Sequence, residues 1–334
     1  MRIFRHLTPL DDEAQGAVVA VGNFDGLHLG HQAVIRAARR LADAAGAPLA
    51  IMTFEPHPRS VFQPNIPPFR LTPFRSKARW IEAFGVDLLF ALHFDLAFAA
   101  ITAEDFVGRL LVAGLKARHV VVGQDFIFGN KRRGNAALLQ ALAARHGFGV
   151  TLVAPETGPD GKIYSSTRIR DFLAHGQPAE AAALLGRDWE IEGRVEPGDR
   201  RGRQLGFPTA NITLGEYLRP ATGVYAVRAV LDRPGTHGPE TVWHAAVANL
   251  GVRPTFGGDG LVFEVNIFDF AEDIYGQHLR VALVEHLRPE KKFDGIAQLK
   301  AQIAHDSARA RALLADRERA QPGGPPARPL QVSE

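Results

Sequence analysis

The sequence predicts an α/β protein with a doubly wound parallel sheet, followed by a small antiparallel β-barrel with a closing helix. In the first half, continuous apolar runs alternate with helical stretches, a pattern typical of parallel strands buried on both faces. In the second half, short strands separated by Gly and Pro turns follow one another without intervening helices. Because 334 residues with 46% hydrophobic content are too many for one ordinary core, two domains are expected.

The elements of the first half follow from hydrophobic periodicity. Apolar runs lie near residues 17–21, 49–54, 86–92, 119–123 and 148–153, and helical stretches near 31–45, 76–84, 103–113 and 135–146. Thr102 with Asp105 forms a capping-box pattern, and Gly85, Gly114 and Gly147 stand where helices are expected to stop. In such sheets ligands bind beyond the carboxyl ends of the strands.

The domain boundary is predicted near residues 186–188, after a short helix at 179–185. Domains of residues 1–186 and 187–316 are therefore expected, with a Pro-, Gly- and charge-rich tail at 317–334 that is predicted to be disordered. Strands of the second domain are predicted near 189–195, 223–231, 241–249, 261–268 and 279–287, and the closing helix at 294–314.

Charge and composition limit the class of protein. A net charge of +3 does not by itself imply a nucleic-acid partner and is equally compatible with small anionic substrates. The absence of cysteine excludes disulfides, thiolate metal sites and cysteine nucleophiles. No uninterrupted apolar run approaches the ~20 residues that span a bilayer. We therefore expect a soluble cytoplasmic protein without membrane or nucleic-acid partners, and the oligomeric state stays open.

The stretch from Gly22 to His31 is the most informative part of the first half. It joins the first apolar run to the first helix, so its glycines and the free N–H groups of the helix start favour an anion such as phosphate. His28 and His31 are three residues apart and would share one face if the turn is already helical. A purely structural turn explains the same residues.

Three later segments also leave predicted strands. His57 stands between two prolines, which hold an extended loop. Asp125, Phe126 and Phe128 follow the strand at 119–123, and the two rings would either stack on a flat ligand or pack in the core. Ser166, Thr167 and Arg168 begin a short helix, where hydroxyls cap the helix and arginines also clamp phosphates.

In the second half, the segment 201–211 combines glycines with basic residues, as a flap over phosphates would. Thr209 and Asn211 alternate onto one side of an extended segment, where a hydroxyl and an amide oxygen suit Mg²⁺. A Gly/Pro-rich connector is the alternative. Glu264 shares one face of a strand with Asn266, opposite the apolar face, and a solvent-facing glutamate is its default interpretation.

These motifs together resemble the bacterial bifunctional riboflavin kinase and FAD synthetase family. Residues 22–31 (GNFDGLHLGH) are similar to its GxFDGxHxGH form of the HxGH nucleotidyltransferase signature, and residues 164–170 (YSSTRIR) to its ISSTRIR-like loop, with Tyr164 replacing an aliphatic residue. Residues 202–211 resemble its GRxLGFPTAN kinase signature, and 249–255 also fit. Pro197-Gly198 stands where the family often has His-Gly, which puts flap dynamics in doubt.

The resemblance implies an N-terminal Rossmann-like nucleotidyltransferase domain that transfers AMP from ATP to FMN, giving FAD and pyrophosphate. Since the acceptor phosphate is already anionic, positioning and charge stabilisation suffice and no general base is required. His28 and His31 would be the catalytic residues. The ATP site implied here comprises Gly22, Asn23, Phe24, His28, Gly30, His31, Ser166, Thr167 and Arg168, and the flavin side His57, Asp125, Phe126 and Phe128.

For the C-terminal domain, the resemblance implies phosphorylation of riboflavin by ATP. Glu264 would be the base that takes the proton from the riboflavin hydroxyl, and Thr209 and Asn211 would hold Mg²⁺. The implied ATP site comprises Gly202, Arg203, Gly206, Thr209 and Asn211, and the implied flavin contacts are Asn249 and Arg253. The partners are then the small molecules riboflavin, FMN and ATP.

Other functions stay open at this point. An adenylyltransferase for another small phosphate ester explains HxGH but leaves residues 201–211 without a role. A noncatalytic flavin or nucleotide sensor, or a basic nucleic-acid binder, would need no turnover. A class I aminoacyl-tRNA synthetase is disfavoured because the chain has no KMSKS-like loop.

Overall fold

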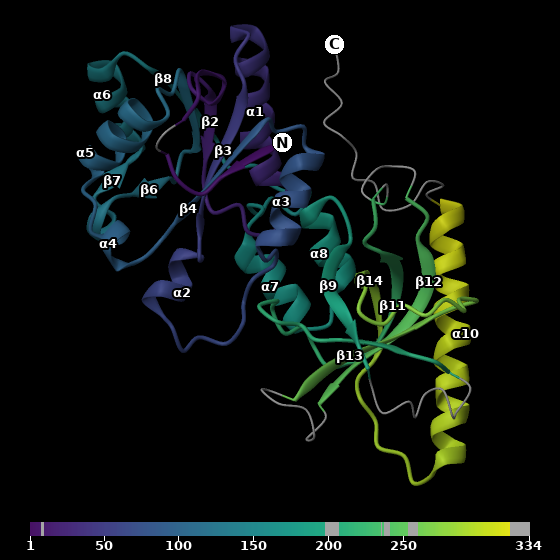
Figure 1. The fold of residues 1–334 in the computed structure, drawn as a ribbon. Coiled ribbons are helices and arrows are strands. Elements are labelled where there is room, and N and C mark those ends of the chain that lie inside the picture. Colours follow the sequence, from purple (N-terminus) through teal and green to yellow (C-terminus); the bar gives the residue numbers. More distant parts are fainter. Residues whose placement is uncertain (8–9, 198–206, 235, 237–240, 253–259, 321–334) are drawn as a thin grey trace. The chain divides into compact units, whose positions relative to one another are not determined.

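The computed structural model describes residues 1–7, 10–197, 207–234, 236, 241–252 and 260–320 (Figure 1). The chain forms two compact units. The first consists of residues 1–67 and 74–165, and the second of residues 68–73 together with the described residues from Ser166 onward. No helix among the described residues is long and apolar enough to cross a membrane.

The first unit contains the predicted parallel sheet. Its strands are β1 (Arg2–Phe4), β2 (Val18–Val21), β3 (Leu49–Glu55), β4 (Leu88–His93), β5 (His119–Gly123) and β8 (Gly149–Val153). Their order is β1-β4-β3-β2-β5-β8, and every neighbouring pair is parallel. The order reverses at β2, with β3 on one side and β5 on the other. The carboxyl end of β2 is therefore the topological switch point, where ligands bind in open α/β sheets.

Helices cover this sheet on both faces. They are α1 (Leu29–Ala45), α2 (Pro58–Phe62), α3 (Phe74–Ala83), α4 (Leu96–Ala99), α5 (Ala103–Asp105), the π-helix η2 (Phe106–Gly114) and α6 (Ala136–His146). Apolar residues of η2 and α6 share one core with Val19 and Val21. Val18 and Ala20, which point to the opposite face of β2, are equally buried. This two-sided burial confirms the prediction of a doubly wound sheet.

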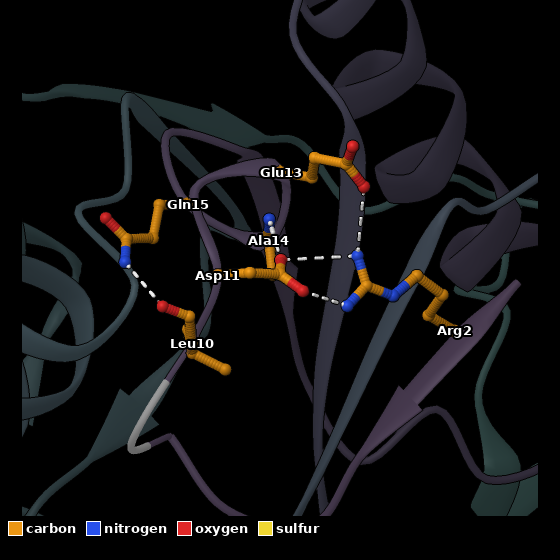
Figure 2. Close-up of polar contacts among 6 residues, drawn as sticks. All are labelled: Arg2, Leu10, Asp11, Glu13, Ala14 and Gln15. Carbon is orange, nitrogen blue, oxygen red and sulfur yellow. Dashed lines mark hydrogen bonds and ion pairs between the residues drawn. The ribbon is translucent and has the colours of Figure 1, made fainter.

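The edge strand β1 was missed by the sequence prediction, because its three residues are too few to show a pattern. Polar contacts hold β1 in place (Figure 2). The Arg2 guanidinium donates hydrogen bonds to the Asp11 carboxylate, and to the Glu13 carboxylate at 3.4 Å. The same Asp11 caps the 3₁₀ helix η1 (Asp12–Ala14) by accepting from the Ala14 N–H at 3.0 Å. Its hydrogen bond to Arg2 holds the pKa of Asp11 below the usual value.

Gly149, the first residue of β8, lies against the imidazole of His119 on β5. A Cβ at this glycine would be 2.1 Å from His119 Nδ1, and the ring is held by a 2.8 Å hydrogen bond between its Nε2 and Thr151 Oγ1. We expect Gly149→Ala to lower the free energy of unfolding by about 1–3 kcal/mol, since overpacking forces the ring or strand to move. Urea unfolding of the purified variant measures this.

Gly108→Ala is the matched control for that change. A Cβ at Gly108, inside η2, would meet no atom within 4 Å, so the substitution is expected to be neutral or to stabilise the protein by about 0.5–1 kcal/mol. Equal unfolding midpoints for the two variants would contradict the packing argument.

The second unit contains the predicted antiparallel barrel. Its strands are β9 (Trp189–Glu196), β10 (Ala210–Ile212), β11 (Gly223–Leu231), β12 (His244–Val252), β13 (Leu261–Ile267) and β14 (His278–Arg288). They close in the order β10-β13-β12-β11-β14-β9, with β10 paired to both β13 and β9. The sequence prediction placed Thr209 and Asn211 on an extended segment but did not include it among the strands, because three residues are too few to show a strand pattern. This short strand nevertheless closes the barrel.

The second unit begins upstream of the predicted boundary at 186/187. Helices α7 (Ser166–Ala174) and α8 (Pro178–Leu185) belong to it. The Ala221 N–H donates to the Leu173 carbonyl at 3.0 Å, and a Cβ at Gly176 would lie 2.9 Å from His286 of β14. These contacts join the helical pair to the barrel.

The closing helix α10 (Ile296–Ala320) lies along β11 and β12 in Figure 1 and is longer than the predicted helix at 294–314. Ala310 and Leu314 pack on the barrel, and Arg317 donates to buried Asp188 at 2.5 Å, which holds the extra turns. Burial raises the pKa of Asp188, an effect that Arg317 opposes. Residues 321–334 lie outside the described residues.

Candidate active sites

The loop after β2 has the geometry of an anion site at the switch point of the first unit. Residues 22–28 connect the carboxyl end of β2 to the N-terminus of α1, whose free N–H groups attract an anion. Phe24 and Leu27 have positive φ angles of 48° and 45°, unusual for large side chains. Both side chains are almost fully buried, and this packing holds the loop in its strained path.

His28 and His31 lie together at the start of α1. Their rings are stacked with centroids 3.6 Å apart and 19° between planes, and the edge of Phe24 contacts His31 at 5.3 Å. His28 is the N-cap residue, and its Nδ1 accepts a 3.3 Å hydrogen bond from the His31 N–H. Nδ1 of His28 therefore acts as a hydrogen-bond acceptor for the helix start. The structure thus brings the two predicted histidines to one place.

Gly30 allows this close arrangement of the histidines. A Cβ at residue 30 would lie 3.3 Å from both Cε1 and Nδ1 of His28, and 3.6 Å from Cβ of Tyr164. Asn23, earlier in the loop, is exposed, and its carbonyl accepts a 3.2 Å hydrogen bond from the Thr53 hydroxyl on β3. The loop is therefore tied to the neighbouring strand through its backbone.

A buried ion pair near this loop was missed by the sequence analysis. Lys77 on α3 has no exposed surface, and its Nζ lies 2.9 Å from Oε1 of Glu55 and 3.5 Å from Oγ1 of Thr53. A usable sequence signal existed: Lys77 is three and four residues before the buried Trp80 and Ile81, so it occupies the apolar face of α3. A charge at such a position needs a buried partner.

The residues predicted for the flavin side differ from one another in exposure and packing. His57 is 9% exposed, caps α2, and accepts a 3.1 Å hydrogen bond from the Arg59 N–H. Asp125 is exposed, and Phe126 and Phe128 are stacked at 5.3 Å. Phe128 is only 7% exposed and packs in the apolar core, as in the alternative to ligand stacking that the sequence left open.

Further aromatic residues, which the sequence analysis did not single out, lie next to these. The Phe128 ring contacts Phe106 at 5.2 Å, and Phe106 in turn contacts Phe54 at 6.4 Å. Phe94 links Phe54 to Phe62, whose ring is 61% exposed at the end of α2. A chain of rings therefore runs from the core to the surface beyond β3.

Ser166, Thr167 and Arg168 begin α7 and belong to the second compact unit, whereas the histidine pair belongs to the first. Thr167 is exposed, and the Arg168 guanidinium lies 5.8 Å from the centroid of the Phe172 ring.

Four strands of the barrel place a row of polar residues side by side. Asn211 on β10 is the register partner of Glu264 on β13 and of Glu196 on β9, and Glu264 is also the partner of Asn249 on β12. Residues directly opposite in antiparallel strands point to the same face, with Cα atoms about 4.5–5.5 Å apart. The half-buried Glu264 carboxylate therefore has an amide-bearing residue on each neighbouring strand.

A cavity of about 370 Å³ opens beside this row. Thr209 and Asn211 line it, together with Glu272, Asp273 and Tyr275. The Asn211 side chain is 7% exposed, and its buried Oδ1 has no hydrogen-bond partner within the described part of the chain. Of the predicted kinase residues, Gly202, Arg203, Gly206 and Arg253 lie outside the described residues.

Comparison with known proteins gives concordant results along the whole chain. Residues 10–168 match the family described as FAD synthetase, and residues 185–314 the family described as riboflavin kinase. The chain is 40% identical over 314 residues to the "Bifunctional riboflavin kinase/FMN adenylyltransferase" of Escherichia coli (strain K12), covering 93% of this chain and 97% of that protein. Identity to the protein of the same name from Bacillus subtilis (strain 168) is 38% over 303 residues, or 89% and 92% of the two chains.

A solved structure shares the fold. The crystal structure described as a macrolide-efflux protein from Streptococcus pneumoniae matches with a TM-score of 0.80 and 32% identity, covering 93% of this chain and 98% of that one. Its name describes that protein, and the likeness extends over both units here. With two family matches in succession and near-full-length relatives of 38–40% identity, the chain belongs to the bifunctional riboflavin kinase/FMN adenylyltransferase family.

Proposed function

We propose that this protein makes both flavin cofactors from riboflavin. The C-terminal domain, within residues 187–316, phosphorylates riboflavin with ATP to give FMN. The N-terminal domain, within residues 1–186, transfers AMP from a second ATP to FMN, giving FAD and pyrophosphate. The observation that carries the proposal is the succession of an FAD synthetase match and a riboflavin kinase match in one chain.

Adenylyl transfer is assigned to the loop at the switch point. An oxygen of the FMN phosphate attacks the α-phosphorus of ATP, the new P–O bond forms, and the bond to the β-phosphate breaks to release pyrophosphate. His28, whose Nδ1 accepts a backbone hydrogen bond, would donate from Nε2 to a phosphate oxygen. His31, stacked on it, would hold a second phosphate oxygen. Both act by positioning and charge stabilisation.

The remaining contacts of this reaction are assigned from the sequence motifs. ATP would be held by Gly22, Asn23, Phe24 and Gly30 of the loop, and by Ser166, Thr167 and Arg168. The flavin side would comprise His57, Asp125, Phe126 and Phe128. Because Phe128 is buried against Phe106, its contribution is to support the half-buried Phe126 ring, which is stacked on it.

Phosphorylation of riboflavin is assigned to the polar row of the barrel. The Glu264 carboxylate takes the proton from the riboflavin hydroxyl as that oxygen attacks the γ-phosphate of ATP, and ADP leaves. Asn211 and Asn249 flank Glu264 on the adjacent strands, so that the carboxylate is held by the sheet. Asn249 and Arg253 would contact the flavin, and Gly202, Arg203 and Gly206 the ATP phosphates.

The donors of the barrel cavity fit a magnesium ion. A hard cation prefers oxygen ligands. Oδ1 of Asn211, which has no hydrogen-bond partner among the described residues, and the Thr209 hydroxyl would supply two from residues that line the same cavity. When bound, Mg²⁺ would neutralise charge on the ATP phosphates. Thr209 and Asn211 are therefore proposed as its protein ligands.

We expect Asn211→Leu to raise the Mg²⁺ concentration needed for half-maximal FMN formation by about tenfold or more, because one of two protein ligands is lost. Titration of Mg²⁺ in the riboflavin kinase assay measures this. The control is FAD formation from supplied FMN by the same variant, whose Mg²⁺ requirement should match that of the wild type. An unchanged Mg²⁺ requirement in the kinase assay would show that Asn211 is not a ligand of the metal.

The proposed function is tested directly with the purified chain, ATP and Mg²⁺. Riboflavin should be converted first to FMN and then to FAD, and added FMN should be converted to FAD with release of pyrophosphate. Chromatography separates the three flavins. Failure to form FMN would exclude riboflavin kinase activity. Transfer of AMP to another phosphate ester, but not to FMN, would favour an adenylyltransferase with a different acceptor.

A further inference from the structure

We infer that Lys77 is a positioning residue for adenylyl transfer, and that it acts through Thr53 and Glu55 on the two loops that leave β2 and β3. This inference rests on the proposed function of the first unit. Lys77 is one of the largest fully buried side chains of the protein, although ionised lysine is rarely buried without an anionic partner. The buried ammonium of Lys77 is therefore expected to have a specific role at Thr53 and Glu55.

The first connection runs from Lys77 to the phosphate loop. Nζ of Lys77 lies 3.5 Å from Oγ1 of Thr53, and the Thr53 hydroxyl donates to the Asn23 carbonyl at 3.2 Å. Thr53 has no exposed surface, so this hydroxyl has its partners inside the protein. Asn23 is the second residue of the stretch that ends with the histidine pair. A hydrogen bond to its carbonyl fixes where the loop leaves the sheet.

The second connection runs from Lys77 to the end of β3. Nζ donates to Oε1 of Glu55 at 2.9 Å, and the Glu55 side chain is only 10% exposed. Glu55 is the last residue of β3, two positions before His57. The buried ammonium therefore contacts two residues at the end of β3, from which the proposed flavin loop departs, and one of them, Thr53, bonds the proposed ATP loop that leaves β2.

The energetics favour a role in positioning over a role in stability. Burying both members of an ion pair carries a large desolvation cost, and well-packed apolar residues at the same positions often make a protein as stable or more stable. The buried face of α3 around Lys77 also carries Trp80 and Ile81. Directional hydrogen bonds from Nζ fix the side chains of Thr53 and Glu55, and Thr53 in turn fixes the loop that leaves β2, which apolar packing at the same site would not do as sharply.

The test compares Lys77→Met with Thr53→Val. Thr53→Val deletes only the connection to the phosphate loop, so it should raise KM for ATP about five- to tenfold and leave KM for FMN unchanged, as expected for one lost hydrogen bond. Lys77→Met deletes both connections and should raise both KM values, with kcat/KM lowered about 100-fold. Steady-state assays of FAD formation separate these effects.

The double variant Lys77→Met/Glu55→Met distinguishes positioning from structure. Removing the Glu55 carboxylate as well should restore the unfolding midpoint toward that of the wild type, while kcat/KM for FAD formation stays low. A purely structural role predicts that activity returns together with stability, and that result would overturn the inference. If Lys77→Met alone does not fold, the double variant and Thr53→Val still decide the question.

Two controls complete the experiment. Thr151→Val removes a comparable strand hydroxyl of the same sheet, bonded to His119 at 2.8 Å, and should change stability without changing either KM. FMN formation from riboflavin should stay at the wild-type rate in every variant. If wild-type protein makes no FAD, the proposed function fails. If it does and the KM values of the variants equal those of the wild type, only the positioning role fails.

Discussion

His28→Ala is expected to lower kcat/KM for FAD formation about 100- to 1000-fold and to leave FMN formation from riboflavin at the wild-type rate. The magnitude is that of removing one preorganised donor to a developing charge. The change deletes the proposed Nε2–H donor, the stacking partner of His31 and the N-cap of α1 together. Chromatographic assay of FAD made from FMN, and of FMN made from riboflavin, measures both activities in one preparation.

The capping and chemical roles of His28 are separable. Asparagine is a strong N-cap residue, so His28→Asn should recover the helix start and the unfolding midpoint without recovering FAD formation. His146→Ala removes an exposed histidine at the end of α6 in the same unit and should change neither activity. Equal loss of FMN and FAD formation in His28→Ala would contradict the assignment of the two reactions to two sites.

Glu264→Gln should have the opposite selectivity. It removes the proposed base while keeping the size and hydrogen-bonding capacity of the side chain between Asn211 and Asn249. We expect kcat for FMN formation to fall about 100- to 10,000-fold, the range for loss of a general base, with little change in KM for riboflavin. FAD formation from supplied FMN should be unaffected.

Glu180→Gln is the matched control for this substitution, since Glu180 is an exposed glutamate on α8 of the same unit. It should leave both activities at the wild-type level. Retention of FMN formation within about threefold in Glu264→Gln would show that this carboxylate is not the base. A parallel fall in FAD formation from supplied FMN would instead indicate general damage to the chain.

The larger elements of the fold were predictable, because each carries its own periodic signal. The strands β2 and β5 are continuous apolar runs, and α1 has apolar residues at helical spacing. The three-residue strands β1 and β10 were missed because no pattern exists over so few residues. These strands form by pairing with other segments of the chain. β1 pairs with β4, and β10 pairs with β13 and β9.

The two candidate sites differ in the same way. His28 and His31 are three residues apart at a helix start, so local backbone geometry was enough to predict that they lie together. The sequence alone placed Glu264 on the polar face of its strand, but which residues flank it depends on strand register. That register aligns Asn211 and Asn249 with it from the two neighbouring strands.

The sequence by itself therefore determined the order of the elements, the two domain types and the histidine pair, because these follow from interactions within a few residues. Only the tertiary structure decided the polar row around Glu264, the burial of Phe128 and the Lys77–Glu55 pair. Each of these depends on which distant segments pack together, and packing is set by the whole core, since a buried charge or ring is stable only where its partners are in place.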